Sequence, residues 1–439
     1  MGRVQIRARC GAIPTEDLRA VAGDGLRVTA RGRWFLGASF LSSLGDVLVV
    51  TAVPFGVGSE TGRIQFSVVF WLVPALAVLV ASFAGRHLAR RVGTARLDYA
   101  MLLLGIAAVE VMISLLTLWL RGTLETLILS IVFVALYAFA KEGIPRLFYQ
   151  VAVYRYFVDG DEYGRLAGMK AGLDIAAALV ATVVAAAIVA TNTWRYAFLF
   201  DAVTFVVLAA TLWFAGRDAA PERPAPTDDT GEPAAAPRVS PALRTGLIAV
   251  LVAIPLFHGV NAAFVNYLPL LNKEFGVMAA STSILLLAVL RLPGMLLGLA
   301  YDRVRRWASP RTWATALPIV FVAVAATYLI QPNVWSVYGL LLLGGLNIGV
   351  FGPSDAVIRN QIPGPYLIGF NVIVLRWLGV FQALACVGAM LVFTYGGMNT
   401  AWLGGIVAAA VIGGLLLPRV HARHPVLART ADEDTRVAV

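Results

Sequence analysis

Ionisable side chains interrupt several of the long apolar runs in this sequence. Those best suited to bind a proton or a charged ligand are, in order along the chain, Asp46, Lys141, Glu142, Asp174, Arg291 and Arg376. A charged group in an apolar, membrane-like interior is costly, so each of them needs a partner, a water-filled cavity or a function. Carboxylates in such places are suited to binding and releasing protons, and arginines are suited to binding anionic groups.

Asp46 is the foremost candidate for a proton-binding group. It is the thirteenth residue of a predicted 24-residue apolar helix, close to its middle, and Gly45 beside it leaves room for water or a partner. A carboxyl group withdrawn from water is suited to loading and unloading a proton. The alternative is a fixed hydrogen bond between helices. Glu142 and Asp174 are the further candidates for proton coupling.

Two pairs of charged residues lie close together in the sequence. Lys141 and Glu142 are adjacent and so point about 100° apart on a helix, which prevents them from pairing in register. We expect one of the two to face a cavity. Lys170 and Asp174 are four residues apart, a spacing that allows an ion pair within one helix. For Lys170, we expect instead that the long side chain extends to the membrane surface.

The buried charges of the second half have the opposite sign. Arg291 and Arg376 have no acidic residue within the predicted helices of their own half. Their partner is either a carboxylate of the first half or an anionic group of a substrate, because guanidinium matches carboxylate geometry. His258 and Asn261 are three residues apart and share a helix face. Together with Lys141, these four residues are the candidates for contact with a substrate.

We predict no metal or cofactor. The four histidines do not form a recognisable metal-binding motif. The sequence contains no Gly-x-x-x-x-Gly-Lys-[Ser/Thr] motif, which is a nucleotide-binding loop. We therefore expect that this chain does not itself use ATP as an energy source. It also lacks the Asp-Asp-x-x-Asp or His-Glu-x-x-His clusters that a membrane enzyme acting on lipid head groups needs.

The elements that must position these residues are apolar helices. Hydrophobic residues make up 59% of the 439 and charged residues only 14%, which excludes a soluble globular enzyme and a disordered chain. A helix crosses the membrane with about 20 apolar residues. We therefore predict an all-α integral membrane protein with twelve transmembrane helices in two six-helix pseudo-repeats around a central cavity. The runs are 34–57, 64–84, 98–120, 126–149, 166–190, 196–215, 245–271, 279–301, 312–330, 335–354, 366–395 and 399–417.

Polar segments divide the chain into an N-terminal half, 34–216, and a C-terminal half, 245–417. Of the 35 Lys and Arg residues, 26 fall on the side that holds the polar segments and four on the opposite side. The positive-inside rule therefore predicts a multi-pass protein of the plasma membrane with both termini in the cytoplasm. Because the positive charge is spread over short loops, we expect no nucleic-acid partner. The polar segments are an N-terminal arm (1–33), a proline-rich linker (217–244) and a C-terminal tail (418–439).

Matching segments indicate that the two halves are repeats. Gly143 and Pro145 end the fourth predicted helix, Gly352 and Pro353 end the tenth, and Pro353 lies 208 residues after Pro145. The loops after the second and eighth helices also match. They read Leu-Ala-Arg-Arg-Val-Gly at 88–93 and Gly-Leu-Ala-Tyr-Asp-Arg-Val-Arg-Arg at 298–306.

On these segments the sequence resembles the major facilitator superfamily of secondary transporters, and within it the drug and siderophore exporter branch. The superfamily's loop signature, Gly-x-Leu-Ala-Asp-Arg-x-Gly-Arg-Arg, is matched in the second half by Gly298, Ala300, Asp302, Arg303 and Arg306. In the first half Leu88, Ala89, Arg91 and Gly93 fit, and Arg90 takes the acidic position. The Trp-Arg-x-x-Phe-x-x-Asp pattern that opens the sixth helix is present as Trp194, Arg195, Phe198 and Asp201.

The resemblance implies a transporter whose halves rock around a central site. It also implies a cytoplasmic gate at the signature loops, formed by Arg90, Arg91, Gly298, Asp302 and Arg303. The sequence departs from the superfamily in a motif that is associated with the exchange of one solute for another. Exchangers of the superfamily carry Gly-Pro-x-x-Gly-Gly in the fifth helix, and the corresponding residues 177–182 contain no Gly-Pro.

The sequence thus predicts a secondary active transporter, not an enzyme. We expect it to export a small amphipathic or anionic molecule, such as a drug, siderophore or natural product, with protons as the coupling ion and the lipid bilayer as its surroundings. We expect a monomer. An uncoupled facilitator or importer of a small anionic solute is one alternative, and a transporter-like sensor or binding subunit without flux is another. Glu110, in the third predicted helix, receives no role.

Overall fold

The fold was examined in a computed structural model, in which the described residues form helices and their connections, with no strand among them. The described residues are 29–61, 64–88, 96–119, 131, 135, 139–144, 148–149, 152–158, 163–216, 239–261, 272, 276–278, 286, 289–362, 364–395, 399–424 and 426–427.

The helices of the first half follow the predicted apolar runs. Asp98 lies in the first turn of α4, where a carboxylate complements the helix dipole. Gly216 ends α9 in an extended conformation. The elements are α2 (Ala30–Thr61), α3 (Ile64–Leu88), α4 (Arg96–Trp119), η1 (Phe139–Gly143), α7 (Ala152–Arg155), α8 (Tyr163–Ala190) and α9 (Tyr196–Ala215).

Several helices of the second half begin at side-chain caps. Ser240 accepts a hydrogen bond from the Leu243 backbone N–H at the start of α10, and Asn333 and Ser336 form a reciprocal capping box at the start of α17. The elements are α10 (Pro241–Ala253), η3 (Ile254–Gly259), α14 (Leu292–Leu299), α15 (Tyr301–Trp307), α16 (Pro310–Ile330), α17 (Val334–Leu346), η4 (Asn347–Phe351), α18 (Gly352–Arg359), α19 (Gly364–Tyr395) and α20 (Asn399–Val420).

Eight helical segments of the described residues are long and apolar enough to cross a membrane. Two shorter apolar helices, Leu72–Ala84 and Gly404–Val420, fall on the second and twelfth predicted runs. The chain is therefore an all-helical, multi-pass membrane protein. The fourth and eighth predicted runs lie only partly within the described residues. The eight segments are Ala30–Val53, Arg96–Trp119, Tyr163–Val189, Tyr196–Ala215, Pro241–Gly259, Pro310–Ile330, Val334–Arg359 and Tyr366–Leu391.

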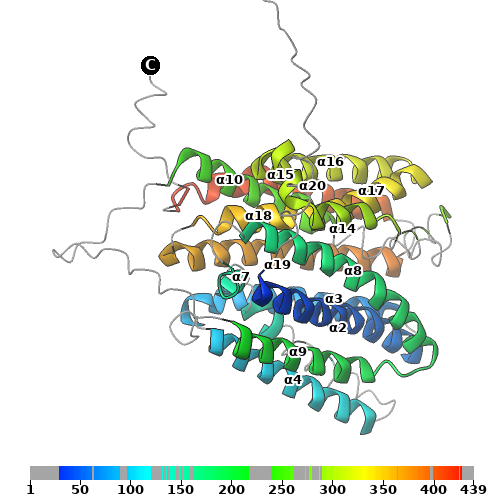
Figure 1. The fold of residues 1–439 in the computed structure, drawn as a ribbon. Coiled ribbons are helices and arrows are strands. Elements are labelled where there is room, and N and C mark those ends of the chain that lie inside the picture. Colours follow the sequence, from blue (N-terminus) through cyan, green and yellow to red (C-terminus); the bar gives the residue numbers. More distant parts are fainter. Residues whose placement is uncertain are drawn as a thin grey trace, which may run out of the picture.

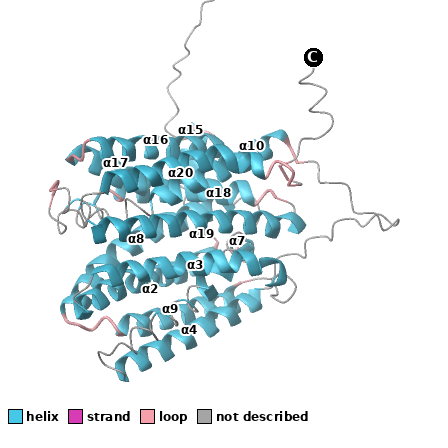
Figure 2. Cartoon of the chain, turned by 180° about the vertical axis from the view of Figure 1, so that it is seen from behind, coloured by secondary structure: helices cyan, strands magenta, loops and turns pink. Residues whose placement is uncertain are grey.

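The helices of the two halves form neighbouring groups (Figures 1 and 2). In the first group α2 packs against α3, α8 and α9, and α4 packs against α9. In the second, α16 packs against α10, α17 and α20. The groups meet along two seams, where α3 packs along α19 and α8 packs against α14 and α18. Because α8 and α19 lie between the groups, their side chains are placed to reach both halves.

Two π-helical segments occupy matching positions of the repeat. η1 begins at Phe139 and η4 begins at Asn347, 208 residues later, which is the offset that relates Pro145 to Pro353. A π-helical turn widens the helix locally and interrupts its regular hydrogen bonding, and such turns occur frequently at functional sites. The repeat inferred from glycine and proline thus extends to the backbone geometry of these segments.

The described part of the C-terminal tail packs back onto the second half. After α20 ends at Val420, the chain turns, and Val426 and Leu427 are buried. The Arg244 guanidinium of α10 donates to the Leu427 carbonyl at 2.7 Å. Burial of two apolar side chains and this hydrogen bond hold the start of the tail against α10.

Candidate functional site

A cavity of about 420 Å³ lies between the two groups of helices. Its walls come from α2, α4, α7, α8 and α9 of the first half and from η3, η4, α18 and α19 of the second. Apolar side chains, serines and charged groups line the cavity together. The cavity therefore offers an apolar surface with a few polar contacts. This combination is typical of sites that bind small molecules.

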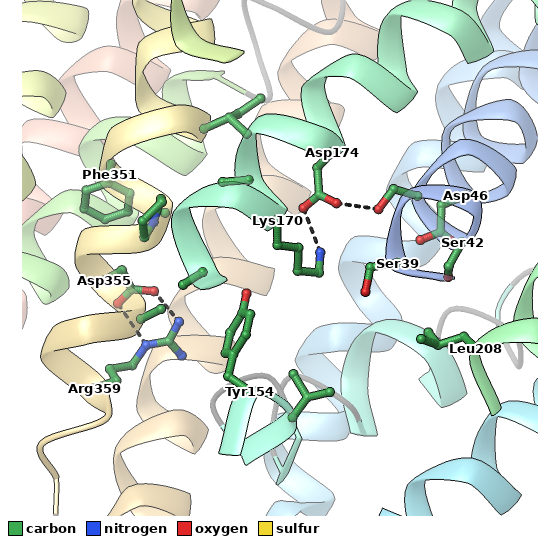
Figure 3. Close-up of a pocket in the computed structure, with 18 of the residues that line it drawn as sticks. Ser39, Ser42, Asp46, Tyr154, Lys170, Asp174, Leu208, Phe351, Asp355 and Arg359 are labelled. Atoms are coloured by element: carbon green, nitrogen blue, oxygen red, sulfur yellow. Dashed lines mark hydrogen bonds and ion pairs between the residues drawn. The ribbon is translucent and has the colours of Figure 1, made fainter. Parts of the chain in front are cut away.

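The first-half wall of the cavity carries a cluster of polar groups (Figure 3). The Lys170 ammonium of α8 donates to Asp174 at 2.7 Å, and the Ser43 hydroxyl of α2 donates to the other oxygen of Asp174 at 2.6 Å. Asp46 lies one turn further along α2, lines the same cavity and interacts electrostatically with Lys170. Two carboxylates and one ammonium group therefore share this wall.

Close packing behind Asp46 sets its position. A Cβ atom at Gly45 would lie 2.8 Å from the Thr204 hydroxyl and 2.9 Å from the Asp201 Cα of α9. The space that glycine leaves is therefore filled by α9, and not by water or a substrate. Asp201 is fully buried there and accepts a hydrogen bond from the Thr204 hydroxyl at 3.1 Å. This contact turns the next residue, Asp46, towards the cavity.

The second-half wall carries an ion pair of its own. Asp355 accepts two hydrogen bonds from the Arg359 guanidinium, with Arg359 Nε 2.8 Å from Asp355 Oδ1. Arg359 also donates to the Asn371 side chain of α19 at 3.3 Å. His258 of η3 lines the cavity nearby, with its ring edge-on to Phe351 at 6.1 Å between centroids. The side chain of Arg359 is only 3% exposed, so its charge depends on Asp355 for compensation.

We expect Asp355→Asn to destabilise the protein by about 3 kcal/mol, because it leaves the Arg359 guanidinium buried without a carboxylate. Unfolding followed by tryptophan fluorescence measures the loss. The double variant Asp355→Asn/Arg359→Leu removes both charges and should recover most of the stability. Equal stability of Asp355→Asn and the parent protein would contradict a buried, mutually compensating pair.

Tyr154 closes the cavity from α7, between the two charged walls (Figure 3). Burial, reinforced by the charge of Asp174, raises the pKa of the Tyr154 phenol. The phenol therefore stays protonated and remains a hydrogen-bond donor at physiological pH. Next to it, the Arg155 guanidinium of α7 donates to the side chain of Asn360, which ends α18, at 2.8 Å.

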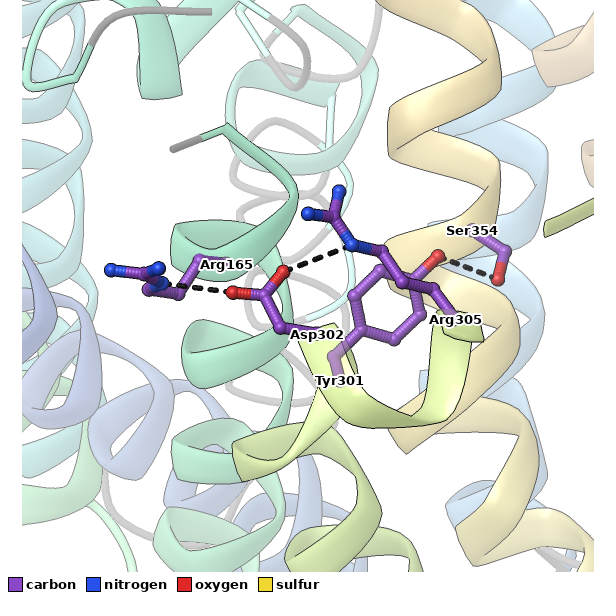
Figure 4. Close-up of polar contacts among 5 residues, drawn as sticks. All are labelled: Arg165, Tyr301, Asp302, Arg305 and Ser354. Carbon is purple, nitrogen blue, oxygen red and sulfur yellow. Dashed lines mark hydrogen bonds and ion pairs between the residues drawn. The ribbon is translucent and has the colours of Figure 1, made fainter. Parts of the chain in front are cut away.

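The signature loop of the second half contacts the first half directly (Figure 4). Asp302 of α15 accepts a hydrogen bond from Arg165 of α8 at 2.8 Å and pairs with Arg305 at 3.2 Å. Tyr301 beside it bonds to the Ser354 hydroxyl at 2.9 Å. The backbones also approach closely, since a Cβ atom at Gly298 would lie 2.9 Å from the Gly172 nitrogen and 3.2 Å from the Gly168 carbonyl oxygen.

The structure separates the remaining predicted residues from the cavity. Arg291 precedes α14, and the Arg376 guanidinium lies over the Phe83 ring of α3 at 4.7 Å. Asn261 is described but is absent from the cavity lining, and Glu110 is fully buried in α4. Arg303 is exposed in α15. Four predictions lie outside the described residues or side chains: Arg90, Arg91, Lys141 and Glu142.

Several residues of the site were missed by reasoning from the sequence. Asp355 and Arg359 are four residues apart, a spacing that indicates an ion pair, but they follow a predicted helix end and read as loop residues. Tyr154 and Arg165 lie in the predicted loop between the runs 126–149 and 166–190. The serines of α2 carry no charge and so gave no signal against the apolar background.

An all-helical membrane protein with a polar cavity between two groups of helices has the architecture of a secondary transporter. The sequence model of the Major Facilitator Superfamily matches residues 35–392. The chain therefore belongs to the Major Facilitator Superfamily and is a transporter, not an enzyme. No relative among curated proteins matches the sequence.

Solved structures share this fold at low sequence identity. A bacterial homologue of the iron transporter ferroportin, in an outward-facing state, superposes with a TM-score of 0.63 at 14% identity, covering 90% of this chain and 100% of that one. The human organic anion transporter MFSD10 gives 0.58 at 16%, covering 88% and 99%. The proton:xylose symporter XylE gives 0.60 at 12%, covering 89% and 96%. These likenesses show the fold alone.

Proposed function

We propose that this chain is a proton-coupled secondary transporter of the drug and siderophore exporter branch, which exports a small amphipathic or anionic molecule by alternating access. Asp46, Asp174 and Glu142 are the proton-coupling residues of the proposal. Among its candidates for contact with substrate, His258 lines the cavity, and Lys141, Asn261, Arg291 and Arg376 are candidates from the sequence alone. The proposed location is the plasma membrane, with both termini in the cytoplasm and a monomeric chain.

The observation that carries the proposal is the cluster of Asp46, Asp174 and Lys170 on the wall of a cavity between the two groups of helices. A carboxylate can release Lys170 when it takes up a proton, and it can hold Lys170 again when the proton leaves. Proton uptake can therefore change which contacts a substrate finds at this wall. The neighbouring Ser43 hydroxyl, which donates to Asp174, can follow the same change.

Alternating access also needs a contact between the halves that opens and closes. In the proposal, this contact between the halves is the one at Asp302 and Gly298. It lies on the arginine-rich side of the protein, which the charge count predicts to be cytoplasmic. Arg165 of α8 and Asp302 of α15 belong to different halves, so their ion pair must break when the halves separate there. We therefore assign the cytoplasmic gate of the proposal to Gly298, Asp302 and Arg303, together with Arg90 and Arg91.

Substrate flux in inverted membrane vesicles tests the proposal. We expect a panel of dyes, siderophores and organic anions to contain a compound that accumulates only when the vesicle lumen is acidic relative to the medium. Dissipating the gradient with a protonophore should release it, and vesicles without the protein provide the control. Flux that ignores the gradient would leave an uncoupled facilitator, and binding without flux would leave a sensor.

A further inference from the structure

The chain folds back on itself where it leaves α20, and two other helices hold it there. Residues 421–424, 426 and 427 follow the end of α20 and are called the strap below. The backbone N–H groups of His424 and Leu427 donate to the carbonyls three residues earlier, which gives the strap its turns. Val426 and Leu427 are buried in the same apolar core as side chains of α10 and α19. The strap is therefore an ordered part of the second half.

Trp377 of α19 makes the most specific contact to the strap. Its indole Nε1–H donates to Nε2 of His421 at 2.9 Å, and the two rings lie edge-on at 6.3 Å between centroids. Three residues further along the strap, His424 lies edge-on to Phe370 of α19, at 6.4 Å between centroids. The strap is thus fastened to α19 at two histidines, and to α10 at its far end by the hydrogen bond described above.

The hydrogen bond between Trp377 and His421 exists only while the imidazole is neutral. The indole nitrogen is a donor and cannot accept, so the His421 nitrogen that faces it carries no proton. A protonated imidazole has an N–H group on both ring nitrogens, and two donors that face each other at 2.9 Å do not bond. Protonation of His421 therefore opposes the fastened strap.

The charged groups around the two histidines act in the same direction. The sequences of α10, α19, α20 and the strap contain no carboxylate that could stabilise an imidazolium, and the tyrosines and the cysteine of α19 are uncharged near neutral pH. Burial and the charge of Arg376 lower the pKa of His421, and burial and His421 lower the pKa of His424. Each of the four segments carries one arginine: Arg244, Arg376, Arg419 and Arg423.

We infer that the strap is a pH-sensitive latch, which is fastened over α10 and α19 while His421 is neutral and is released when His421 takes up a proton. The fastened form binds this proton less tightly than the released form. Fastening is therefore favoured in full above the ordinary pKa of histidine, about 6.5, and is lost as the pH falls through the lowered pKa. The charge count predicts this side to be cytoplasmic, so the latch responds to acidification of the cytoplasm. The inference goes beyond the proposed function and does not rest on it.

Access to a buried residue of the strap measures its release. A cysteine replaces the fully buried Val426 in a chain whose own two cysteines are replaced by alanine, and the protein is labelled with a maleimide in phosphatidylcholine nanodiscs. A cysteine at Ala422, which is exposed in the fastened strap, gives the reference for the pH dependence of thiol reactivity. We expect the ratio of the two rates to rise about tenfold from about pH 8 to about pH 5, because the released form binds the proton more tightly.

Substitutions at the contact identify the group that responds. His421→Gln keeps an acceptor for the Trp377 N–H but does not titrate, so labelling should stay slow at pH 8 and lose most of its rise at pH 5. The double variant His421→Gln/His424→Gln should lose the rise completely. Trp377→Phe removes the donor and should raise the rate several-fold already at pH 8. Trp335→Phe is its matched control, since Trp335 of α17 is exposed and lies outside the strap contacts.

Hydrogen exchange tests the latch in the unmodified protein. The backbone N–H groups of His424 and Leu427 are hydrogen-bonded within the strap. After correction for the chemical exchange rate at each pH, their protection should fall about tenfold between pH 8 and pH 5. Protection that changes less than about twofold would overturn the inference. A labelling response that persists at full size in His421→Gln/His424→Gln would overturn it as well.

Discussion

Asp46→Asn is expected to abolish gradient-driven accumulation of substrate in inverted vesicles, with a loss of at least about tenfold in initial rate. The variant keeps the size and hydrogen-bonding groups of the side chain but cannot take up a proton. Asp46 lines the cavity beside Lys170 and Asp174, so a proton bound there changes the charge that a substrate meets. Accumulation needs that change in every cycle, because the gradient acts only through the proton.

A second measurement on the same variant separates coupling from folding. Exchange of labelled for unlabelled substrate, with no proton gradient imposed, does not need a net proton movement. We therefore expect Asp46→Asn to retain exchange. Asp46→Glu preserves the titratable group and should retain part of the driven transport. Driven accumulation by Asp46→Asn at the parent rate would show that the coupling proton binds elsewhere.

Gly298→Val is expected to keep the two halves apart at the signature loop and so to stop transport. A Cβ atom at this position would lie 2.9 Å from the Gly172 nitrogen and 3.1 Å from the Gly172 Cα. Backbone atoms cannot move aside as a flexible side chain does, so α14 must shift away from α8. The ion pair between Arg165 and Asp302, a few residues further on, then loses its geometry. The expected result is a gate that no longer closes.

Chemical labelling measures the state of this gate. A cysteine placed at Ser43, on the cavity wall, reacts with a membrane-impermeant maleimide at a rate that reports access from the arginine-rich side. The host chain has Cys10 and Cys386 replaced by alanine. We expect Gly298→Val to raise the labelling rate about tenfold, the change that corresponds to a population shift of about 1.4 kcal/mol.

A glycine without close neighbours provides the matched control for the gate. A Cβ atom at Gly105 of α4 meets nothing within 4 Å, so Gly105→Val should leave both labelling and transport near the parent values. Elution as a single symmetric peak in size-exclusion chromatography checks that each variant is folded. Unchanged labelling in a folded Gly298→Val protein would mean that this contact does not govern access to the cavity.

Much of the local structure could be predicted from the sequence. The apolar runs predicted the helices because burial in a membrane demands about 20 apolar residues in succession, and that demand is local. The ion pair of Lys170 and Asp174 was available from its four-residue spacing, although the sequence favoured extension of Lys170 to the membrane surface. The repeat predicted from Gly143 and Pro145 has its counterpart in the π-helical segments η1 and η4.

The composition of the cavity was decided by tertiary structure. The rotation and tilt of a helix against its neighbours decide which of its faces meets the cavity. A helix that is apolar on all sides shows no pattern in its sequence from which that face could be predicted. Arg291 and Arg376 therefore lie off the cavity, while Asp355 and Arg359, which read as loop residues, line it. From the sequence, the missing side chain of Gly45 was expected to leave room for water or a partner, and in the fold α9 occupies that room.

By itself, the sequence determined that this chain is a helical membrane protein of the Major Facilitator Superfamily, because hydropathy and the signature loops are local features. Only the tertiary structure decided which charges meet. Helices distant in the sequence bring Asp46, Lys170 and Asp355 to one cavity, and the charge that a substrate encounters is the sum over all of its walls.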